Sequence, residues 1–101
     1  SFIEANYHVK ASWFGIPILL SKKINRNQFL KKIAKYGIET RPIISGNFLK
    51  QPAIKKYKLN KSTKFKNSDI VNNHGFFIGL PTSSISDKNI KKLVGAFEKS
   101  L

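Results

Sequence analysis

The sequence predicts a small α+β domain: a sheet of about three strands with helices packed mainly on one face. Three apolar stretches rich in β-branched and aromatic residues are separated by segments with helical periodicity. A chain of 101 residues is large enough for one modest core but not for two, so we expect a single domain over residues 1–101. Hydrophobic residues make up 41% and charged residues 24%, which is typical of a globular domain.

The first predicted strand covers residues 12–20. Phe14 and Ile16 begin one apolar face at period two, and Trp13 and Leu19 lie on the other. Because both faces of this strand are apolar, we expect both to be covered and the aromatic side chains to be buried.

Two more strands are predicted, at 38–44 and 76–81. In the first of them Ile and Thr residues favour an extended backbone. Pro42 has no N–H to donate, which places this strand at an edge of the sheet or turns the missing donor outward.

The first predicted helix runs from a cap at Asn25 or Asn27 to about Tyr36, and Gly37 can end it in the left-handed conformation. Its apolar residues recur at helical spacing and form the predicted buried stripe, which consists of Phe29, Leu30, Ile33 and Ala34.

Three more helices are predicted further along the chain. Pro52 suits the first turn of a short helix, and Asn67 or Ser68 begins another that ends at Gly75. Ser86 begins the last helix. Its apolar residues follow the i, i+3, i+4, i+7 pattern of an amphipathic helix and are Ile90, Leu93, Val94 and Phe97.

The formal net charge of +14 comes from nineteen Lys and Arg residues against five acidic ones. A polyanion such as nucleic acid is one interpretation. A second is compositional drift, because Lys, Asn and Ile are all abundant and most Lys residues fall on predicted solvent faces. The predicted polar loop at 58–66 is rich in Lys, and Tyr57 and Phe65 are interleaved with these cations. Such an arrangement occurs in proteins that bind nucleic acid, and it is also found in solvated loops.

The sequence lacks the residues that several kinds of catalytic and metal site require. There is no Cys, so thiol catalysis and thiolate metal sites are excluded, and His8 and His74 have no partner at metal-ligand spacing. Neighbouring carboxylates and phosphate-cradling Gly-rich loops are also missing. We therefore predict no catalytic residue and no metal site in this chain, no membrane span, and a cytoplasmic location.

One stretch looks like part of a ligand site. Arg41 lies on the predicted strand 38–44, and a turn of Ser45, Gly46 and Asn47 follows it. An Arg presents a planar fork that matches carboxylate or phosphate. We take Arg41, Ser45, Gly46 and Asn47 as candidate substrate-binding residues. Solvation of Arg41 in a purely structural interaction domain is the other interpretation.

Four motifs that occur in order carry a family resemblance. They are Ser12-Trp13-Phe14-Gly15-Ile16-Pro17, Gly37-Ile38-Glu39-Thr40-Arg41-Pro42, Gly46-Asn47-Phe48-Leu49-Lys50-Gln51-Pro52-Ala53 and Gly79-Leu80-Pro81. From about Ala11 to the end, the chain resembles the C-terminal domain of the DegT/DnrJ/StrS family of sugar-nucleotide aminotransferases, which depend on pyridoxal phosphate (PLP). The pattern is most similar to a branch with perosamine-type aminotransferases and 4-keto-6-deoxyhexose 3-dehydrases.

The resemblance implies a C-terminal fragment of a longer enzyme, the small domain of a fold-type-I PLP enzyme that is normally a homodimer. It implies that the large domain of the same polypeptide carries PLP and the Schiff-base residue, and that this chain alone binds no cofactor and is not catalytic. It further implies a sugar nucleotide and glutamate as ligands of the parent, a role in O-antigen or capsule biosynthesis, and Arg41 as the clamp for the carboxylate of glutamate.

A free-standing basic nucleic-acid-binding module is the alternative that remains. Such modules gather cations and exposed aromatic side chains on one surface. Because the aromatic residues here fall in apolar patterns, we expect no specific nucleic-acid binding.

Overall fold

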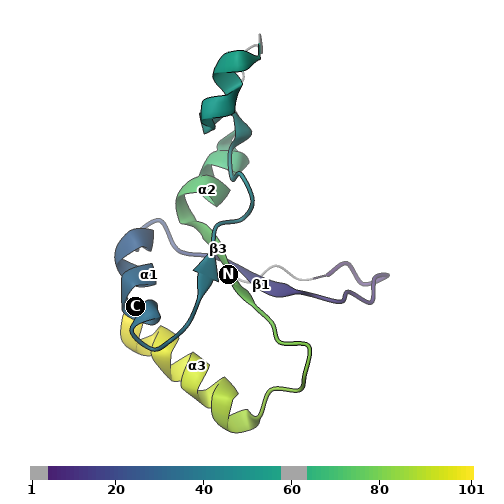
Figure 1. The fold of residues 1–101 in the computed structure, drawn as a ribbon, viewed down its shortest axis with the longest axis vertical. Helices are drawn as coiled ribbons and strands as arrows, with labels where there is room; N and C mark the ends of the chain where they lie inside the picture. The colour runs from purple at the N-terminus through teal and green to yellow at the C-terminus, as the bar shows by residue number, and fades with distance from the viewer. Residues whose placement is uncertain (1–4, 58–63) are drawn as a thin grey trace.

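The computed structural model describes residues 5–57 and 64–101. Three strands, three α-helices and two short 3₁₀ helices follow one another in the chain (Figure 1). In chain order they are β1 (Gly15–Leu19), α1 (Arg26–Ala34), β2 (Thr40–Arg41), η1 (Phe48–Lys50), η2 (Pro52–Lys56), α2 (Lys66–His74), β3 (Gly75–Gly79) and α3 (Asp87–Ser100). The predicted loop at 58–66 falls mostly on residues 58–63, which lie outside the described residues.

The three strands form one antiparallel sheet with β3 in the middle and the order β1-β3-β2. Gly15 lies opposite Gly79 and Leu19 opposite Gly75, so β1 pairs along its whole length. On the other side Thr40 lies opposite Ile78 and Arg41 opposite Phe77. The prediction of a three-stranded α+β sheet is therefore confirmed.

The edge strand β2 is shorter than predicted. Pairing stops at Arg41, immediately before Pro42, which has no N–H for the ladder. Ile44 then adopts φ 43°, a left-handed conformation that no strand residue has, and its side chain is 91% exposed. Of the predicted strand over 38–44, only Thr40 and Arg41 form a strand, and the prediction is wrong for the residues on either side of them.

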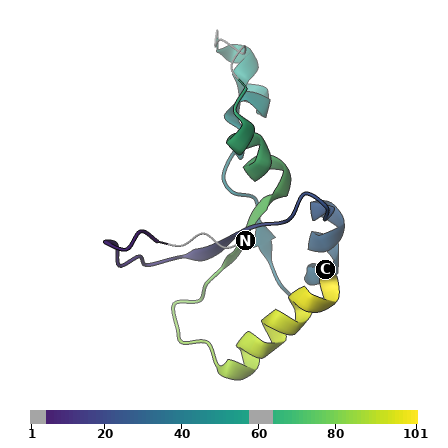
Figure 2. The ribbon, with the colours of Figure 1, turned by 180° about the vertical axis from the view of Figure 1, so that it is seen from behind.

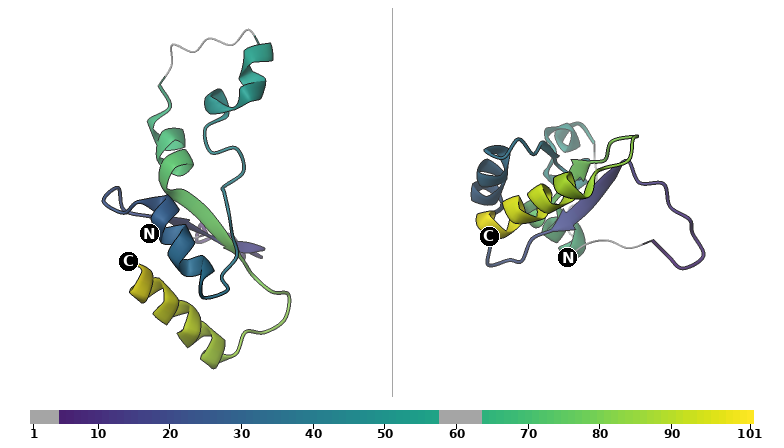
Figure 3. Two further views of the ribbon diagram at one scale, coloured as in Figure 1. Left: turned by 60° about the vertical axis from the view of Figure 1, so that its left-hand side comes forward. Right: turned by 90° about the horizontal axis from the view of Figure 1, so that it is seen from below.

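The core lies between the sheet and the two helices α1 and α3, which cover the same face of the sheet (Figure 3). Phe29 and Ile33 of α1 are at most 1% exposed, and the ring of Phe29 contacts those of Phe76 and Phe97 at centroid distances of 5.9 and 5.4 Å. Aromatic rings at these separations attract one another beyond the area they bury. The fully buried core residues are Ile18, Phe29, Ile33, Phe76 and Ile78.

The opposite face of the sheet is not covered by a helix of the described residues (Figure 2). Phe14 packs edge-on against Phe77 at 5.4 Å, yet Phe14 is 78% exposed and Trp13 is 45% exposed. The expectation that both faces of the first strand are covered is wrong. The alternating pattern of the first strand shows which of its side chains are apolar, but it does not show whether another part of the protein packs on them. The described residues contain no second layer that covers this face.

Most predicted helix boundaries agree with local capping. The Asn25 side chain accepts a hydrogen bond from the Gln28 N–H, and the Ser86 hydroxyl accepts one from the Asn89 N–H. Gly37 has the predicted left-handed backbone, with φ 76°, but α1 ends at Ala34, before the predicted end at about Tyr36.

Two helix details differ from prediction. Helix α2 begins at Lys66 with Phe65 at its N-cap, not at Asn67 or Ser68, and no side chain caps it. Ala34 is exposed, whereas Phe29 and Ile33 are buried and Leu30 is half-buried against the core.

Helix α3 packs through a stripe shifted from the predicted one. Ile90 and Val94 are 44% and 50% exposed, whereas Ala96 and Ser100 are buried. Leu93, Ala96, Phe97 and Ser100 keep the i, i+3, i+4, i+7 spacing, so the periodicity is right and the face is rotated. A helix at the edge of a small core buries only the side that its neighbours reach.

The elements η1, η2 and α2 project from the sheet as an arm (Figure 1). The whole molecule is elongated for this reason, with extents of 51 × 36 × 22 Å. Arg26 of α1 holds the base of the arm: its guanidinium donates to the carbonyl oxygens of Asn72 and Gly75 at 2.8 and 2.9 Å. These are carbonyls at the end of α2, where a cation is favourable.

Candidate functional site

Arg41 lies on the edge strand β2 with its guanidinium in solvent. Its Nε and one terminal nitrogen donate to Oε1 of Glu39 at 3.2 and 2.9 Å. The two side chains are 69% and 78% exposed, so water screens this ion pair and its contribution to stability is small. Because the Arg41 side chain is largely exposed and its other terminal nitrogen takes no part in this contact, the guanidinium remains accessible to an anion.

A hollow of about 410 Å³ opens beside Arg41. The end of β3 and the segment leading to α3 line it with apolar groups, including Phe77, Leu80 and Ile85. Arg41 and Glu39 supply its charged edge. An apolar hollow with one directional cation can orient a ligand that carries a carboxylate.

The turn that follows is built against helix α2. Gly46 has φ 59°, and a Cβ placed there would lie 2.7 Å from Oδ1 and 2.8 Å from Cα of Asn72. The Gly46 N–H donates to the Ile43 carbonyl at 2.8 Å. Both the left-handed backbone and the close approach of α2 require glycine here.

Asn47 is buried, with 6% of its surface exposed. Its Nδ2 donates to Oδ1 of Asp69 at 2.9 Å, and its Oδ1 accepts from the Leu49 N–H at 3.0 Å, which caps η1. The amide side chain is thus engaged at both ends inside the chain. Ser45 is half-buried, and its carbonyl accepts a hydrogen bond from Nε2 of Gln51 at 2.9 Å.

Asp69 joins this turn to the arm. Nζ of Lys50 lies 2.7 Å from its Oδ1. The hydrogen bond from Lys50, and after it the one from Asn47, hold the pKa of Asp69 below its ordinary value of 3.8. Sequence reasoning missed Asp69 and Asn72 because both are remote in sequence from the turn and no local pattern links them.

The four candidate residues therefore fall into two groups. Ser45, Gly46 and Asn47 lie together against α2, and Arg41 stands on the sheet edge beside Glu39. In the parts of the chain that the structure describes, the side-chain hydrogen bonds of Arg41 go to Glu39 and not to the turn. The substrate-binding role of all four stays a prediction.

The described residues do not fit a PLP site. Such a site brings a Schiff-base Lys together with a carboxylate for the pyridinium nitrogen. Two other hollows, of about 1050 and 500 Å³, contain Lys residues but no carboxylate, and the hollow that contains Glu39 has no Lys. Asp69 is held by Lys50 and Asn47. No step of a PLP reaction can be assigned to these residues.

The described residues contain neither a metal site nor a helix that could span a membrane. In 5–57 and 64–101 no three His, Asp or Glu side chains gather as a metal site. Nor is any helix of these ranges long and apolar enough to cross a membrane.

Comparison with known proteins gives the family. The profile of the DegT/DnrJ/EryC1/StrS aminotransferase family matches residues 2–98. The chain belongs to this family. This membership confirms the resemblance carried by the four sequence motifs. The relatives of the chain indicate which branch of the family it is similar to.

Two curated members of the family are about one third identical to this chain. A GDP-4-keto-6-deoxy-D-mannose 3-dehydratase of Yersinia pseudotuberculosis is 33% identical over 93 residues, which are 89% of this chain and 23% of that protein. The lipopolysaccharide biosynthesis protein RfbH of Salmonella typhimurium is 30% identical over 98 residues, which are 95% of this chain and 22% of RfbH. The chain spans less than a quarter of the length of either relative.

The fold has a solved counterpart in the same branch. A GDP-4-keto-6-deoxymannose-3-dehydratase with a trapped PLP-glutamate geminal diamine superposes with a TM-score of 0.73 at 28% identity. The superposition covers 84% of this chain and 22% of that one. The fold prediction, a small unit of a fold-type-I PLP enzyme, is confirmed.

Proposed function

We propose that this chain is the C-terminal small domain of a PLP-dependent enzyme that acts on a nucleotide-linked 4-keto-6-deoxy sugar in surface-polysaccharide biosynthesis. The observation that carries the proposal is the match over residues 2–98 to the family, together with dehydratase relatives that match most of this chain. The parent removes a hydroxyl group or transfers an amino group. The large domain of the same polypeptide supplies PLP and the residue that bonds to it.

In this proposal the chain forms one wall of the substrate cleft and closes it. The uncovered face of the sheet supports this role, because Phe14 and Phe77 form an apolar surface there that the described residues leave open. An exposed apolar patch of this kind marks a contact surface. The large domain of the same polypeptide covers it, and the parent works as a homodimer.

Arg41 binds the carboxylate of glutamate in this scheme. Its guanidinium is exposed, is held loosely by Glu39, and stands at the edge of the apolar hollow. An Arg–carboxylate contact is charge-assisted and directional, and a Lys cannot reproduce its two parallel hydrogen bonds. Ser45, Gly46 and Asn47 would shape the neighbouring wall, with Asn47 acting through its hold on the backbone.

Arg41→Lys in the full-length enzyme tests the clamp. Loss of one charge-assisted hydrogen bond costs about 1.5–3 kcal/mol, or roughly ten- to a hundredfold in binding. We expect the KM for glutamate to rise by this factor, while the KM for the sugar nucleotide changes little. Steady-state kinetics with each substrate varied in turn measures the two values.

Thermal unfolding of the same variant is the control, since an exposed Arg contributes little packing. Unchanged glutamate kinetics combined with a lower melting temperature would make Arg41 a structural residue. Absence of all activity toward nucleotide-linked 4-keto-6-deoxy sugars in the unmodified enzyme would instead contradict the proposed function itself.

The free-standing nucleic-acid-binding module loses its main support. Its strongest argument was the charge of +14, and the family match supports an enzymatic parent in which the same cations need no nucleic-acid partner. Trp13 and Phe14 are exposed, contrary to expectation, but they border the open sheet face.

A further inference from the structure

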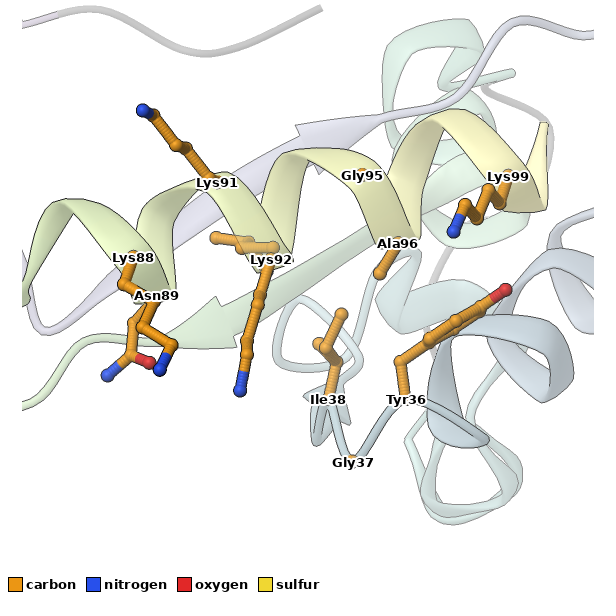
Figure 4. Close-up of a pocket in the computed structure, with 11 residues that line it drawn as sticks. Tyr36, Gly37, Ile38, Lys88, Asn89, Lys91, Lys92, Gly95, Ala96 and Lys99 are labelled. Atoms are coloured by element: carbon orange, nitrogen blue, oxygen red, sulfur yellow. The ribbon is translucent and has the colours of Figure 1, made fainter.

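A second surface, away from Arg41, has the features of a docking groove. It runs between helix α3 and the segment Tyr36-Gly37-Ile38, and encloses about 1050 Å³ (Figure 4). In the close-up, Lys92 and Ala96 project from α3 toward this segment, whereas Lys91 projects to the other side. The groove therefore has two walls from remote parts of the chain.

The rim of the groove is cationic. Lys88, Lys92 and Lys99 line it, whereas Lys91 borders it but projects to the other side of α3, and no carboxylate of the described residues lines it. All four are exposed. Lys92 and Lys99 are seven residues apart, which is about 10 Å along a helix axis, so their charges flank the groove rather than meet at one point.

The floor of the groove is apolar. Ala96 is 3% exposed, Leu93 and Ile38 are half-buried, and the ring of Tyr36 is 52% exposed at one end. Contacts with water at such a floor are unfavourable, so a ligand that covers it gains free energy in proportion to the apolar area buried.

We propose that this groove is a docking surface for an acidic amphipathic helix of a partner protein. The apolar side of such a helix covers Leu93, Ala96 and Ile38, and its carboxylates meet the Lys residues on the rim. Helix-in-groove recognition of this kind uses apolar anchors in the groove and charges at its edge. Complementary charges set the orientation and the rate of association more than the affinity.

Other occupants fit less well. A second copy of this groove would bring its own Lys-lined rim against the same Lys residues, and these like charges repel one another. Single-stranded nucleic acid binds by stacking successive bases on aromatic side chains, and Tyr36 is the one aromatic residue that lines the groove. A bilayer surface meets the rim but leaves a concave apolar floor uncovered.

The test uses the intact polypeptide that carries this chain and a defined probe. The probe is a fluorescent peptide of about 18 residues, with Glu and Leu placed at amphipathic helical spacing, long enough to span α3. The control is a peptide with the same amino-acid composition in scrambled order. Fluorescence anisotropy at about 0.15 M salt gives the dissociation constants.

Two double variants that change the charge by the same amount distinguish probe binding in the groove from attraction by the overall charge. Lys92→Glu with Lys99→Glu alters the rim, and Lys55→Glu with Lys56→Glu alters exposed positions on η2, far from the groove. We expect the rim variant to weaken probe binding at least tenfold and the η2 variant to change it by less than about twofold. Circular dichroism checks that each variant is folded.

Tyr36→Ala tests the apolar part without a change of charge. We expect it to weaken the amphipathic probe about three- to tenfold, and the scrambled peptide to bind at least tenfold more weakly than the ordered one. Equal binding of both peptides, or equal loss in both double variants, would overturn the proposal and leave only non-specific attraction.

Three further outcomes also overturn it. Tighter binding of poly(U), lost in the rim variant, would make the occupant a nucleic acid. Tighter binding of phosphatidylglycerol vesicles, lost in the same variant, would make it a membrane. No probe binding to the intact polypeptide, with Lys92 and Lys99 protected from acetylation, would mean that another part of the same polypeptide fills the groove.

Discussion

At the scale of single residues, Asp69 is the carboxylate on which the candidate site most depends. Its Oδ1 lies 2.7 Å from Nζ of Lys50 and accepts a hydrogen bond from Nδ2 of Asn47 at 2.9 Å. Because Asp69 belongs to helix α2, these contacts hold the turn against that helix. Both contacts favour the charged form, which is why the pKa of Asp69 is lowered. The contacts stabilise the fold only while Asp69 is ionised.

The pH dependence of stability follows from this shift. A carboxyl group with a lowered folded-state pKa stabilises the folded state above its unfolded pKa, and this stabilisation is lost as pH falls through the folded pKa. We expect Asp69→Asn to lower the free energy of unfolding at about pH 6, and the difference from the unmodified chain to shrink when pH falls below 3.8. Urea unfolding at both pH values measures it.

Glu98→Gln is the matched control for this measurement, because Glu98 is an exposed carboxylate on α3 that forms no ion pair with any of the described residues. A pH-dependent difference of the same size in this variant would show that the overall charge, and not the network around Asp69, causes the effect.

At the scale of elements, three glycines differ in backbone conformation and in how closely another element packs against them. Gly46 and Gly37 both have left-handed backbones, but only Gly46 lies against another element, the helix α2. Gly95 lies within helix α3, and a Cβ added there meets nothing within 4 Å. Alanine at the three positions therefore probes three different physical situations.

We expect Gly37→Ala to cost about 1–2 kcal/mol from the left-handed backbone alone. Gly46→Ala should cost more than this, because its Cβ would lie 2.8 Å from the Asn72 backbone and α2 would have to move. Gly95→Ala should raise stability by about 0.5–1 kcal/mol, since glycine inside a helix is unfavourable. Chemical unfolding of the three variants ranks them; equal costs at Gly37 and Gly46 would rule out the crowding.

At the scale of the whole molecule, the described residues cover the sheet on one side only. Phe29, at 1% exposed, lies at the centre of the covered side, and Phe14, at 78% exposed, lies on the open side. The same residue type therefore contributes to folding in one place and offers a contact surface in the other.

Phe29→Ala should cost about 3–5 kcal/mol, because it leaves a cavity between α1, β3 and α3. Phe14→Ala should change the stability of this chain by about 0.5 kcal/mol or less, the usual effect at an exposed position. Calorimetric melting temperatures of both variants give the comparison. A large loss in Phe14→Ala would mean that the sheet face is packed within the chain after all.

Much of the architecture follows from the sequence, because its causes are local. Period-two and helical patterns predict the elements, Asn25, Gly37 and Ser86 predict their ends, and the apolar stripe of α1 predicts Phe29 and Ile33 as core. The motifs predict the family for the same reason, since they are read along the chain.

The tertiary structure alone decides what depends on contacts between remote residues. It places Asn72 and Asp69 against Gly46 and Asn47, separates Arg41 from that turn, rotates the buried face of α3, and leaves Phe14 uncovered. None of these follows from spacing, because a pattern states which residues are apolar or polar, whereas packing selects the neighbour that each one meets.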